Sequence, residues 1–164
     1  MTRAVSIVAS HPHKRKIGSD LIMWELGTDY SHVSWIFWSK DLKTPFYYES
    51  TMHGGVTFTG QEHWEARNRA VFLRHFELSE DEYDEFLELA MSRCGEEYGF
   101  WQNLGIKINN LLKLGYNIFG NGGELANCSE LIFDFAHLVR LEIGIRNPDL
   151  VTPYDIVEAC KARA

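Results

Sequence analysis

SHVSWIFW spans residues Ser31 to Trp38, and FYYES follows at Phe46 to Ser50. Both stretches are dense in β-branched and aromatic side chains, which favour β-strands. A polar turn around Lys40-Asp41 separates them. The pattern therefore predicts an antiparallel β-hairpin at the centre of the fold.

Within this hairpin, the spacing brings a histidine and a carboxylate together. If the hairpin is symmetric about Lys40-Asp41, His32 stands directly opposite Glu49 on the same face, with Cβ atoms about 4.5–5.5 Å apart. A carboxylate in that position could orient the imidazole. An odd-length connection would instead turn Glu49 to the other face. A solvent-facing cross-strand pair is the alternative explanation of the same spacing.

Sequence patterns on both sides of the hairpin complete an α+β protein, a small antiparallel β-sheet packed against helices. The further predicted strands are Ala4–Ala9, Val56–Thr59 and Val71–Leu78, with a turn or short helix over Gln61–Arg69. The predicted helices are Leu21–Leu26, Tyr83–Cys94, Trp101–Leu114, Asn127–Leu141 and Tyr154–Lys161. Capping boxes or N-cap residues at Ser79, Asn127 and Thr152 mark three of the helix starts.

Composition limits the classes of function. The chain has 164 residues and is 45% hydrophobic, which suits one domain spanning residues 1–164. Its formal net charge of -7 argues against nucleic-acid binding. The basic stretch His11 to Lys16 (HPHKRK) reads as a solvated loop.

The number of cysteines and the N-terminal residues indicate the cellular compartment in which we expect the protein. Cys94, Cys128 and Cys160 make an odd number, which argues for a reducing environment. The apolar run Ala4–Ala9 is too short to span a membrane, and its basic residues follow it instead of preceding it as in a secretory signal. We therefore expect a cytoplasmic protein without a transmembrane segment.

Asn127-Cys128-Ser129-Glu130 is the strongest chemical motif. Asn127 and Glu130 form an asparagine version of the capping box, so Cys128 occupies the first helical position. There the helix dipole favours a thiolate, and the Cys128 N–H could face an oxyanion. The alternative is a buried apolar cysteine, since Cys128 shares a helix face with Leu131, Ile132, Phe135 and Val139.

The sequence offers no metal or cofactor motif. Neither a His-Glu-x-x-His nor a Cys-x-x-Cys pattern is present, and the glycines between Gly115 and Gly123 form no nucleotide-binding motif. We expect no metal and no cofactor.

Five strings in order resemble one known family. IGSDLIMWELGTDYSHVSWIF, YYESTMHGGV, GEEYGFWQNLG, NCSELIFDFA and VTPYDIV are similar to the permuted papain-like amidases and peptidases of the NlpC-type superfamily. The likeness is strongest to the YiiX-like group, with lecithin retinol acyltransferases as more distant relatives. It implies a circularly permuted papain-like fold.

The resemblance implies a role for each candidate site residue. Cys128 is the nucleophile, His32 its general base and Glu49 the residue that orients His32. Tyr98, Tyr30 and Asn127 are candidates for oxyanion or substrate contacts.

The expected activity is a thiol hydrolase that cleaves an amide bond through an acyl-enzyme. Its substrate would be a peptide, a peptidoglycan fragment or an acyl-lipid, and a cell-wall role would require delivery by lysis or a virion. One alternative is a lipid acyltransferase or esterase. The other is a non-catalytic module that binds a peptide or lipid in a groove formed by aromatic residues, which make up 13% of the chain.

Overall fold

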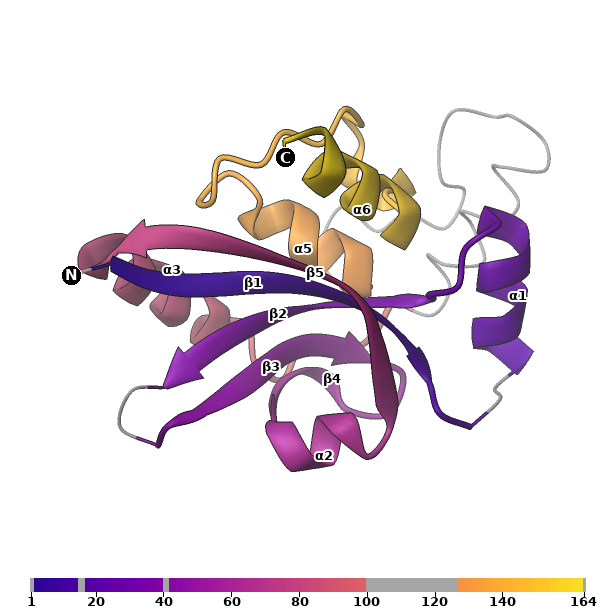
Figure 1. The fold of residues 1–164 in the computed structure, drawn as a ribbon, viewed down its shortest axis with the longest axis horizontal. Helices are drawn as coiled ribbons and strands as arrows, with labels where there is room; N and C mark the ends of the chain where they lie inside the picture. Colours follow the sequence, from indigo (N-terminus) through magenta and orange to yellow (C-terminus); the bar gives the residue numbers. More distant parts are fainter. Residues whose placement is uncertain (1, 15–16, 40–41, 100–126, 164) are drawn as a thin grey trace.

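The computed structural model describes residues 2–14, 17–39, 42–99 and 127–163. Five strands form one antiparallel sheet in the order β4-β3-β2-β1-β5 (Figure 1). The strands are β1 Thr2–Pro12, β2 His32–Ser39, β3 Thr44–Thr51, β4 Gly55–Gly60 and β5 Asn68–Ser79. The helices are α1 Ile17–Leu26, α2 Gln61–Glu65, α3 Glu80–Ser92, α5 Cys128–Phe135, the 3-10 helix Pro148–Leu150 and α6 Pro153–Ala162. The predicted α+β class, a small antiparallel sheet packed against helices, is confirmed.

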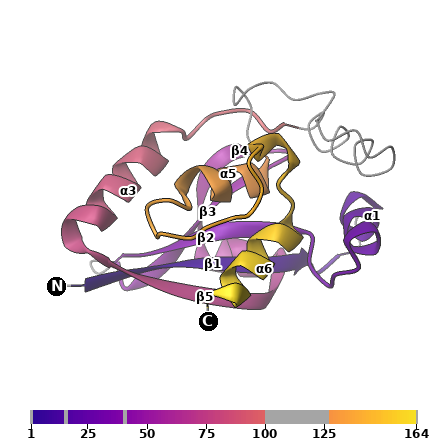
Figure 2. The same ribbon diagram turned by 90° about the horizontal axis from the view of Figure 1, so that it is seen from above.

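Helices α3, α5 and α6 cover one face of the sheet and form the main core with it (Figures 1 and 2). Every second residue of β2 points into this core, as the two-residue period of a strand requires. Trp35 is fully buried there, and its ring contacts Phe86 edge-on at a centroid distance of 4.9 Å. Burying a side chain of this size stabilises the fold by about 2–3 kcal/mol. This core fixes α5 against β2 and β3.

The other face of the sheet carries a smaller core beneath α2. The rings of Tyr47 and Trp64 stack at 4.0 Å, and Val8 packs with them. Tyr47 belongs to β3, so the alternation of side chains places Glu49 on this same face. The Glu49 carboxylate, a candidate site group in the sequence analysis, therefore lies on the face of the sheet that α2 covers.

The hairpin of β2 and β3 forms, but its register differs from the predicted one. Trp35 pairs with Tyr48 and Trp38 with Pro45, which places each β2 residue opposite a β3 residue two positions later than predicted. The directly opposite pairing of His32 and Glu49 was wrong by two residues. Because a shift of two preserves the face, both side chains still lie on the same side of the sheet, diagonally related.

Two predicted helix starts are confirmed and one predicted helix end was wrong. Ser79 with Glu82 and Thr152 with Asp155 form complete capping boxes. Helix α5 was expected to reach Leu141 but ends at Phe135. Beyond it the chain makes tight turns, with Arg140 at a φ of 55° and the Leu141 N–H bonded to the Ala136 carbonyl. Apolar spacing continues through these turns, which explains the overlong prediction.

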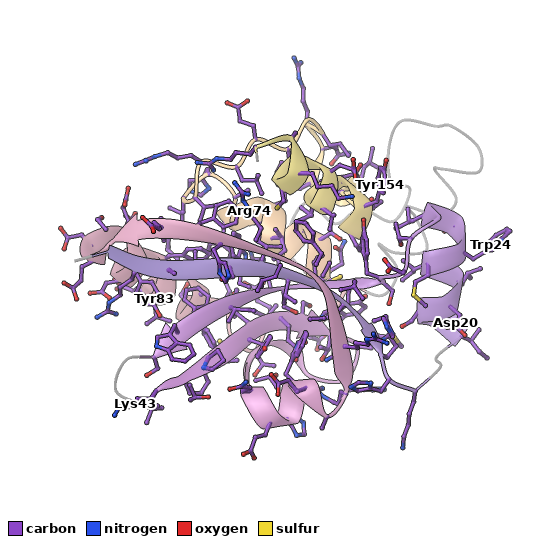
Figure 3. The ribbon with its side chains drawn as sticks, in the orientation of Figure 1. Asp20, Trp24, Lys43, Arg74, Tyr83 and Tyr154 are labelled. Atoms are coloured by element: carbon purple, nitrogen blue, oxygen red, sulfur yellow. The ribbon has the colours of Figure 1, made fainter. Side chains whose placement is uncertain are left out.

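Helix α1 stands at one end of the sheet and ends at Gly27, whose φ is 64°. None of its side chains is buried, and Trp24, 80% exposed, points away from the body of the protein (Figure 3). The predicted helix Trp101–Leu114 and the glycine-rich connection after it lie outside the described residues. No helix in the described ranges is long and apolar enough to cross a membrane.

Candidate active site

The site forms where two strands of the sheet stop pairing. The β2–β3 ladder ends at Trp35 and Tyr48, whereas β2 continues back to His32 alongside β1. The start of β2 is therefore paired on one side, and its other edge faces the beginning of α5. This opening lets a side chain from α5 meet side chains from the opposite face of the sheet.

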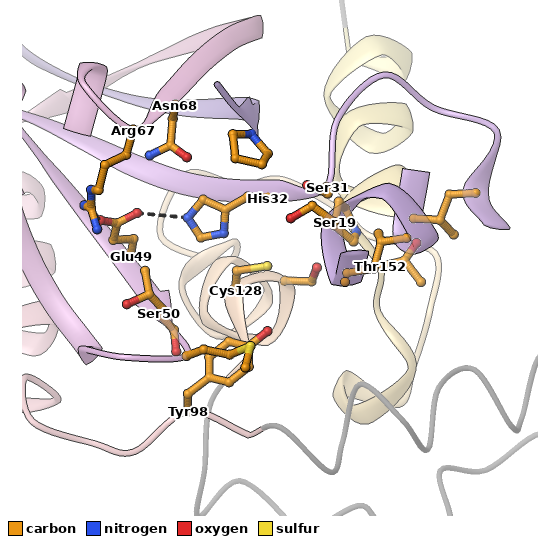
Figure 4. A pocket seen from close by; sticks show the side chains of 18 of the residues that line it. Ser19, Ser31, His32, Glu49, Ser50, Arg67, Asn68, Tyr98, Cys128 and Thr152 are labelled. Carbon is orange, nitrogen blue, oxygen red and sulfur yellow. Dashed lines mark hydrogen bonds and ion pairs between the residues drawn. The ribbon is translucent and has the colours of Figure 1, made fainter. Parts of the chain in front are cut away.

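His32 and Glu49 meet at this opening (Figure 4). The imidazole Nε2 donates to the Glu49 Oε2 at 2.9 Å, and the Ser34 Oγ lies 3.1 Å from the same nitrogen. The side chain of Glu49 is 1% exposed and that of His32 is 17% exposed. The structure thus brings the predicted histidine and carboxylate into direct contact despite the shifted register.

Glu49 is a fully hydrogen-bonded buried carboxylate. Its Oε1 accepts from the Thr59 hydroxyl at 2.8 Å and from the Arg67 guanidinium at 2.9 Å. Burial acts to raise the pKa of Glu49, but hydrogen bonds and charge from His32, with help from Thr59 and Arg67, hold it below its usual range. Glu49 is therefore charged at neutral pH and fixes the imidazole in one orientation.

Cys128 occupies the first position of α5, as the motif predicts. The Asn127 Oδ1 accepts from the N–H groups of Ser129 and Glu130, both at 2.9 Å, and the Glu130 carboxyl accepts from the Asn127 N–H. The Leu131 N–H bonds to the Asn127 carbonyl. These bonds fix the helix start, and the Cys128 N–H takes no part in them.

The His32 imidazole lies between Cys128 and Glu49 (Figure 4), close enough to the Cys128 thiol to shift its pKa. Since Nε2 faces Glu49, the nitrogen toward Cys128 is Nδ1. The backbone of Val33 and the side chain of Ser129 also lie near the sulfur and lower its pKa. Three groups that favour the thiolate therefore surround one sulfur atom.

These contacts favour an ion pair over the neutral pair. Burial acts to raise the pKa of Cys128, but the hydrogen bond and charge of His32 lower it, and Val33 and Ser129 add to this. Burial acts to lower the pKa of His32, but Cys128 and Glu49 raise it to about 10. Both shifts act in the direction of a thiolate next to an imidazolium.

The other two cysteines have the opposite electrostatics. Burial raises the pKa of Cys160 to about 11, and burial also raises the pKa of Cys94. Neither lines the cavity around Cys128. Within the described residues, Cys128 alone has its thiol pKa lowered.

A cavity of about 540 Å³ opens over Cys128, His32 and Glu49. This volume lies within the range of about 300–1,000 Å³ that is typical of small-molecule sites. Helix α1 forms one wall, and much of the lining is apolar, including Ile22, Leu26, Met52 and Val151. No group of three metal-binding side chains is found in the part of the chain that the structure describes.

The three residues predicted to contact the oxyanion or the substrate lie in different parts of the structure. Tyr98 lines the cavity (Figure 4). Tyr30 is 6% exposed and packs in the main core, where burial raises its pKa to about 12. Asn127 is 1% exposed and caps α5 without lining the cavity. The structure brings Tyr98 to the site, and it places Tyr30 and Asn127 outside it.

Sequence reasoning missed the groups that hold the pair in place. Arg67 and Thr59 bind Glu49, and the backbone of Val33 lies near Cys128. No local motif marks these residues, because their roles depend on where the strands separate and on how α2 returns the chain to β5.

Asn127→Ala is expected to lower the free energy of unfolding by about 1–2 kcal/mol, because two N–H groups of α5 lose their acceptor. Urea denaturation measures the loss. Asn147→Ala is the matched control, since Asn147 caps only the 3-10 helix with a single bond to the Asp149 N–H at 3.1 Å. Equal losses in the two variants would contradict the importance of the α5 cap.

Comparison with known proteins gives a fold relationship. No family model matches the sequence, and no curated protein matches it. A crystal structure described as metalloprotein yiiX from Escherichia coli O157:H7 is similar, with a TM-score of 0.58 and 15% sequence identity. The match covers 95% of this chain and 91% of that chain. The chain therefore shares the yiiX fold over nearly its whole length, in agreement with the predicted YiiX-like architecture.

Proposed function

We propose that the protein is a thiol hydrolase that cleaves an amide bond through an acyl-enzyme formed on Cys128. The observation that carries this proposal is the arrangement of Cys128 at the start of α5, His32 beside it and Glu49 bonded to His32, all three lining one cavity. Burying an ion pair costs desolvation free energy, so it is seldom found without a function. Strongly perturbed pKa values in a cleft are accordingly typical of functional sites.

We also propose that the chain is a permuted papain-like enzyme. The order of histidine, carboxylate and cysteine along the chain supports this, together with the cysteine at a helix start packed against a sheet that carries the histidine. The similarity to yiiX supports the fold part of the proposal. The activity rests on the site and not on the fold.

In the first half of the reaction, the Cys128 thiolate adds to the amide carbonyl carbon. The carbonyl oxygen gains the negative charge, and the N–H at the start of α5 is placed to stabilise it. The C–N bond then breaks, and the His32 imidazolium gives its Nδ1 proton to the leaving amine. The products of this half are a free amine, a thioester on Cys128 and a neutral imidazole.

In the second half, neutral His32 removes a proton from water, and the resulting hydroxide adds to the thioester carbonyl. The C–S bond breaks, which releases a carboxylic acid and restores the thiolate and the imidazolium. Glu49 stays charged throughout and stabilises the imidazolium in both halves.

The proposed substrates are a peptide, a peptidoglycan fragment or an acyl-lipid. The apolar side chains of the cavity wall favour a substrate with an apolar portion next to the reacting carbonyl. The same thioester could pass its acyl group to an acceptor other than water, which would make the enzyme an acyltransferase or esterase. A binding groove of aromatic residues has little support, since Tyr98 is the one aromatic residue among the described cavity residues.

Iodoacetamide labelling at pH 6.5 is expected to modify Cys128 about 10–100 times faster than Cys94, although Cys94 is the exposed cysteine. An ordinary thiol with a pKa near 8.5 is about 1% ionised at that pH, whereas the lowered pKa of Cys128 keeps its thiolate. Mass spectrometry of the separate cysteine peptides measures each rate. Cys160, buried in α6, is the internal control. Faster labelling of Cys94 than of Cys128 would contradict the ion pair.

Hydrolysis itself is tested with a panel of peptide and fatty-acyl amides. The expected results are amine release and an acyl mass increment on the Cys128 peptide that hydroxylamine removes. The rate should fall at acidic pH as the thiolate is protonated. It should also fall as the pH rises toward about 10, where His32 loses the proton that it gives to the amine. Amine release without any adduct on Cys128 would sink the proposal.

A further inference from the structure

One hydroxyl group in the cavity is buried and has no partner. Ser31 immediately precedes His32 and is 6% exposed. Its backbone is fixed, because its N–H donates to the Ser10 carbonyl at 3.0 Å. The Ser31 Oγ has no hydrogen bond among the residues that the structure describes, yet Ser31 lines the cavity over Cys128.

An unpartnered hydroxyl in a buried position is unfavourable for folding, and most buried polar groups in proteins have a partner. A valine or alanine would fill the same position without that cost. Because Ser31 is one of the residues that line the cavity, a ligand bound there can supply the missing partner once the side chain turns toward it.

The position of Ser31 complements that of the ion pair. In Figure 4, Glu49 and His32 lie on one side of Cys128, and Ser31 lies on the other side together with Ser19 of α1. The first side supplies charge to the nucleophile and protons to the leaving group. The second side has hydroxyl groups, which can donate to a neutral carbonyl oxygen that becomes negative only during the reaction.

We propose that the Ser31 hydroxyl donates to the carbonyl oxygen of the acyl group that Cys128 attacks, as the side-chain partner of the Cys128 N–H. This inference rests on the proposed function and adds a catalytic residue to it. The substrate it implies has a planar acyl carbonyl, an amide or ester, seated between Cys128 and Ser31. As sulfur adds to carbon, the C=O π electrons move to the oxygen, and the two donors stabilise that charge.

Ser10 provides a matched control. It is a buried serine on the adjacent strand, 0% exposed, and its Oγ also lacks a partner among the described residues. Ser10 does not line the cavity. Removal of its hydroxyl therefore reproduces the packing change of Ser31→Ala without touching the proposed carbonyl site.

The test uses two reagents on the full chain, in wild type, Ser31→Ala and Ser10→Ala. Iodoacetamide reports the thiolate alone, because its alkylation of sulfur builds no oxyanion. The first-turnover release of p-nitrophenolate from p-nitrophenyl acetate reports acylation, which does build one. The melting temperature is measured alongside.

In Ser31→Ala we expect the acylation rate to fall about 100-fold, the usual effect of removing one oxyanion donor. The iodoacetamide rate should stay within about twofold of wild type, since the contacts of Cys128 with His32 remain. The melting temperature should be unchanged or higher, because an unpartnered hydroxyl is lost. Ser10→Ala should keep both rates.

Two results would overturn the inference. One is acylation of Ser31→Ala at the wild-type rate. The other is an equal fall in both rates, which would place Ser31 on the thiolate and not on the carbonyl. Activated thiolates attack p-nitrophenyl acetate even without a natural substrate, so the ratio of the two rates remains readable if wild type hydrolyses no amide. A wild-type protein that hydrolyses no amide would contradict the proposed function but would leave this test of Ser31 intact.

Discussion

Cys128→Ser is expected to lower amide hydrolysis by about 10⁴–10⁶-fold, the usual effect of removing an enzyme nucleophile. A serine hydroxyl has a much higher pKa than a thiol, so the groups that lower the pKa of Cys128 cannot produce an alkoxide in its place. Steady-state hydrolysis of the best amide in the panel measures the loss. Because serine differs from cysteine by one atom, the fold should be retained, as circular dichroism and urea denaturation can check.

Replacing the other two cysteines separates this effect from a general loss of thiols. Cys94→Ser changes an exposed side chain, and Cys160→Ala changes a buried one in α6. Both variants should keep the hydrolysis rate within about threefold, although Cys160→Ala is expected to lose about 1 kcal/mol of stability from the smaller side chain. Residual hydrolysis in Cys128→Ser above about 1% of wild type would argue for a different nucleophile.

His32→Ala is expected to slow iodoacetamide labelling of Cys128 at pH 6.5 by at least about 100-fold. The variant removes the largest influence that lowers the thiol pKa, while the burial that raises it remains. The labelling rate should then rise steadily with pH through the range of an ordinary or raised thiol pKa. A rate that stays at the wild-type value would show that the thiolate does not depend on His32.

His75→Ala and Glu49→Gln serve as comparisons for the labelling rate of His32→Ala. His75→Ala removes a histidine that is hydrogen-bonded to the Ser6 Oγ at 2.7 Å outside the cavity, and it should leave the labelling rate unchanged. Glu49→Gln keeps the size of the side chain but removes its charge. Because Glu49 contributes less than Cys128 to the raised pKa of His32, we expect a smaller decrease, about 10-fold, in Cys128 labelling.

The sequence predicted those parts of the fold and site that depend on local patterns. The capping motif placed Cys128 at the start of α5 because cap geometry is set by neighbouring residues. Strand composition identified β2 and β3, and the two-residue period placed His32 and Glu49 on one face. The exact pairing failed because register depends on the conformation of the turn, which composition does not determine.

The supporting contacts could not be predicted because they join distant segments. Arg67 reaches Glu49 only after α2 has turned the chain, and Cys128 lies near Val33 only because α5 packs against β2. Tyr30 was a candidate for an oxyanion or substrate contact, but its ring packs in the main core. A tyrosine with strong packing and one with a polar role look alike in a sequence.

The opening between β2 and β3 also has a consequence for folding kinetics. His32 and Glu49 belong to one hairpin and can meet early, whereas Cys128 comes from a helix far later in the chain and closes a long loop to reach them. In a partly folded chain in which α5 has not docked, the Cys128 thiol reacts as slowly as an ordinary thiol. The cysteine therefore becomes reactive only when this helix docks, and the appearance of that reactivity during refolding would time the docking.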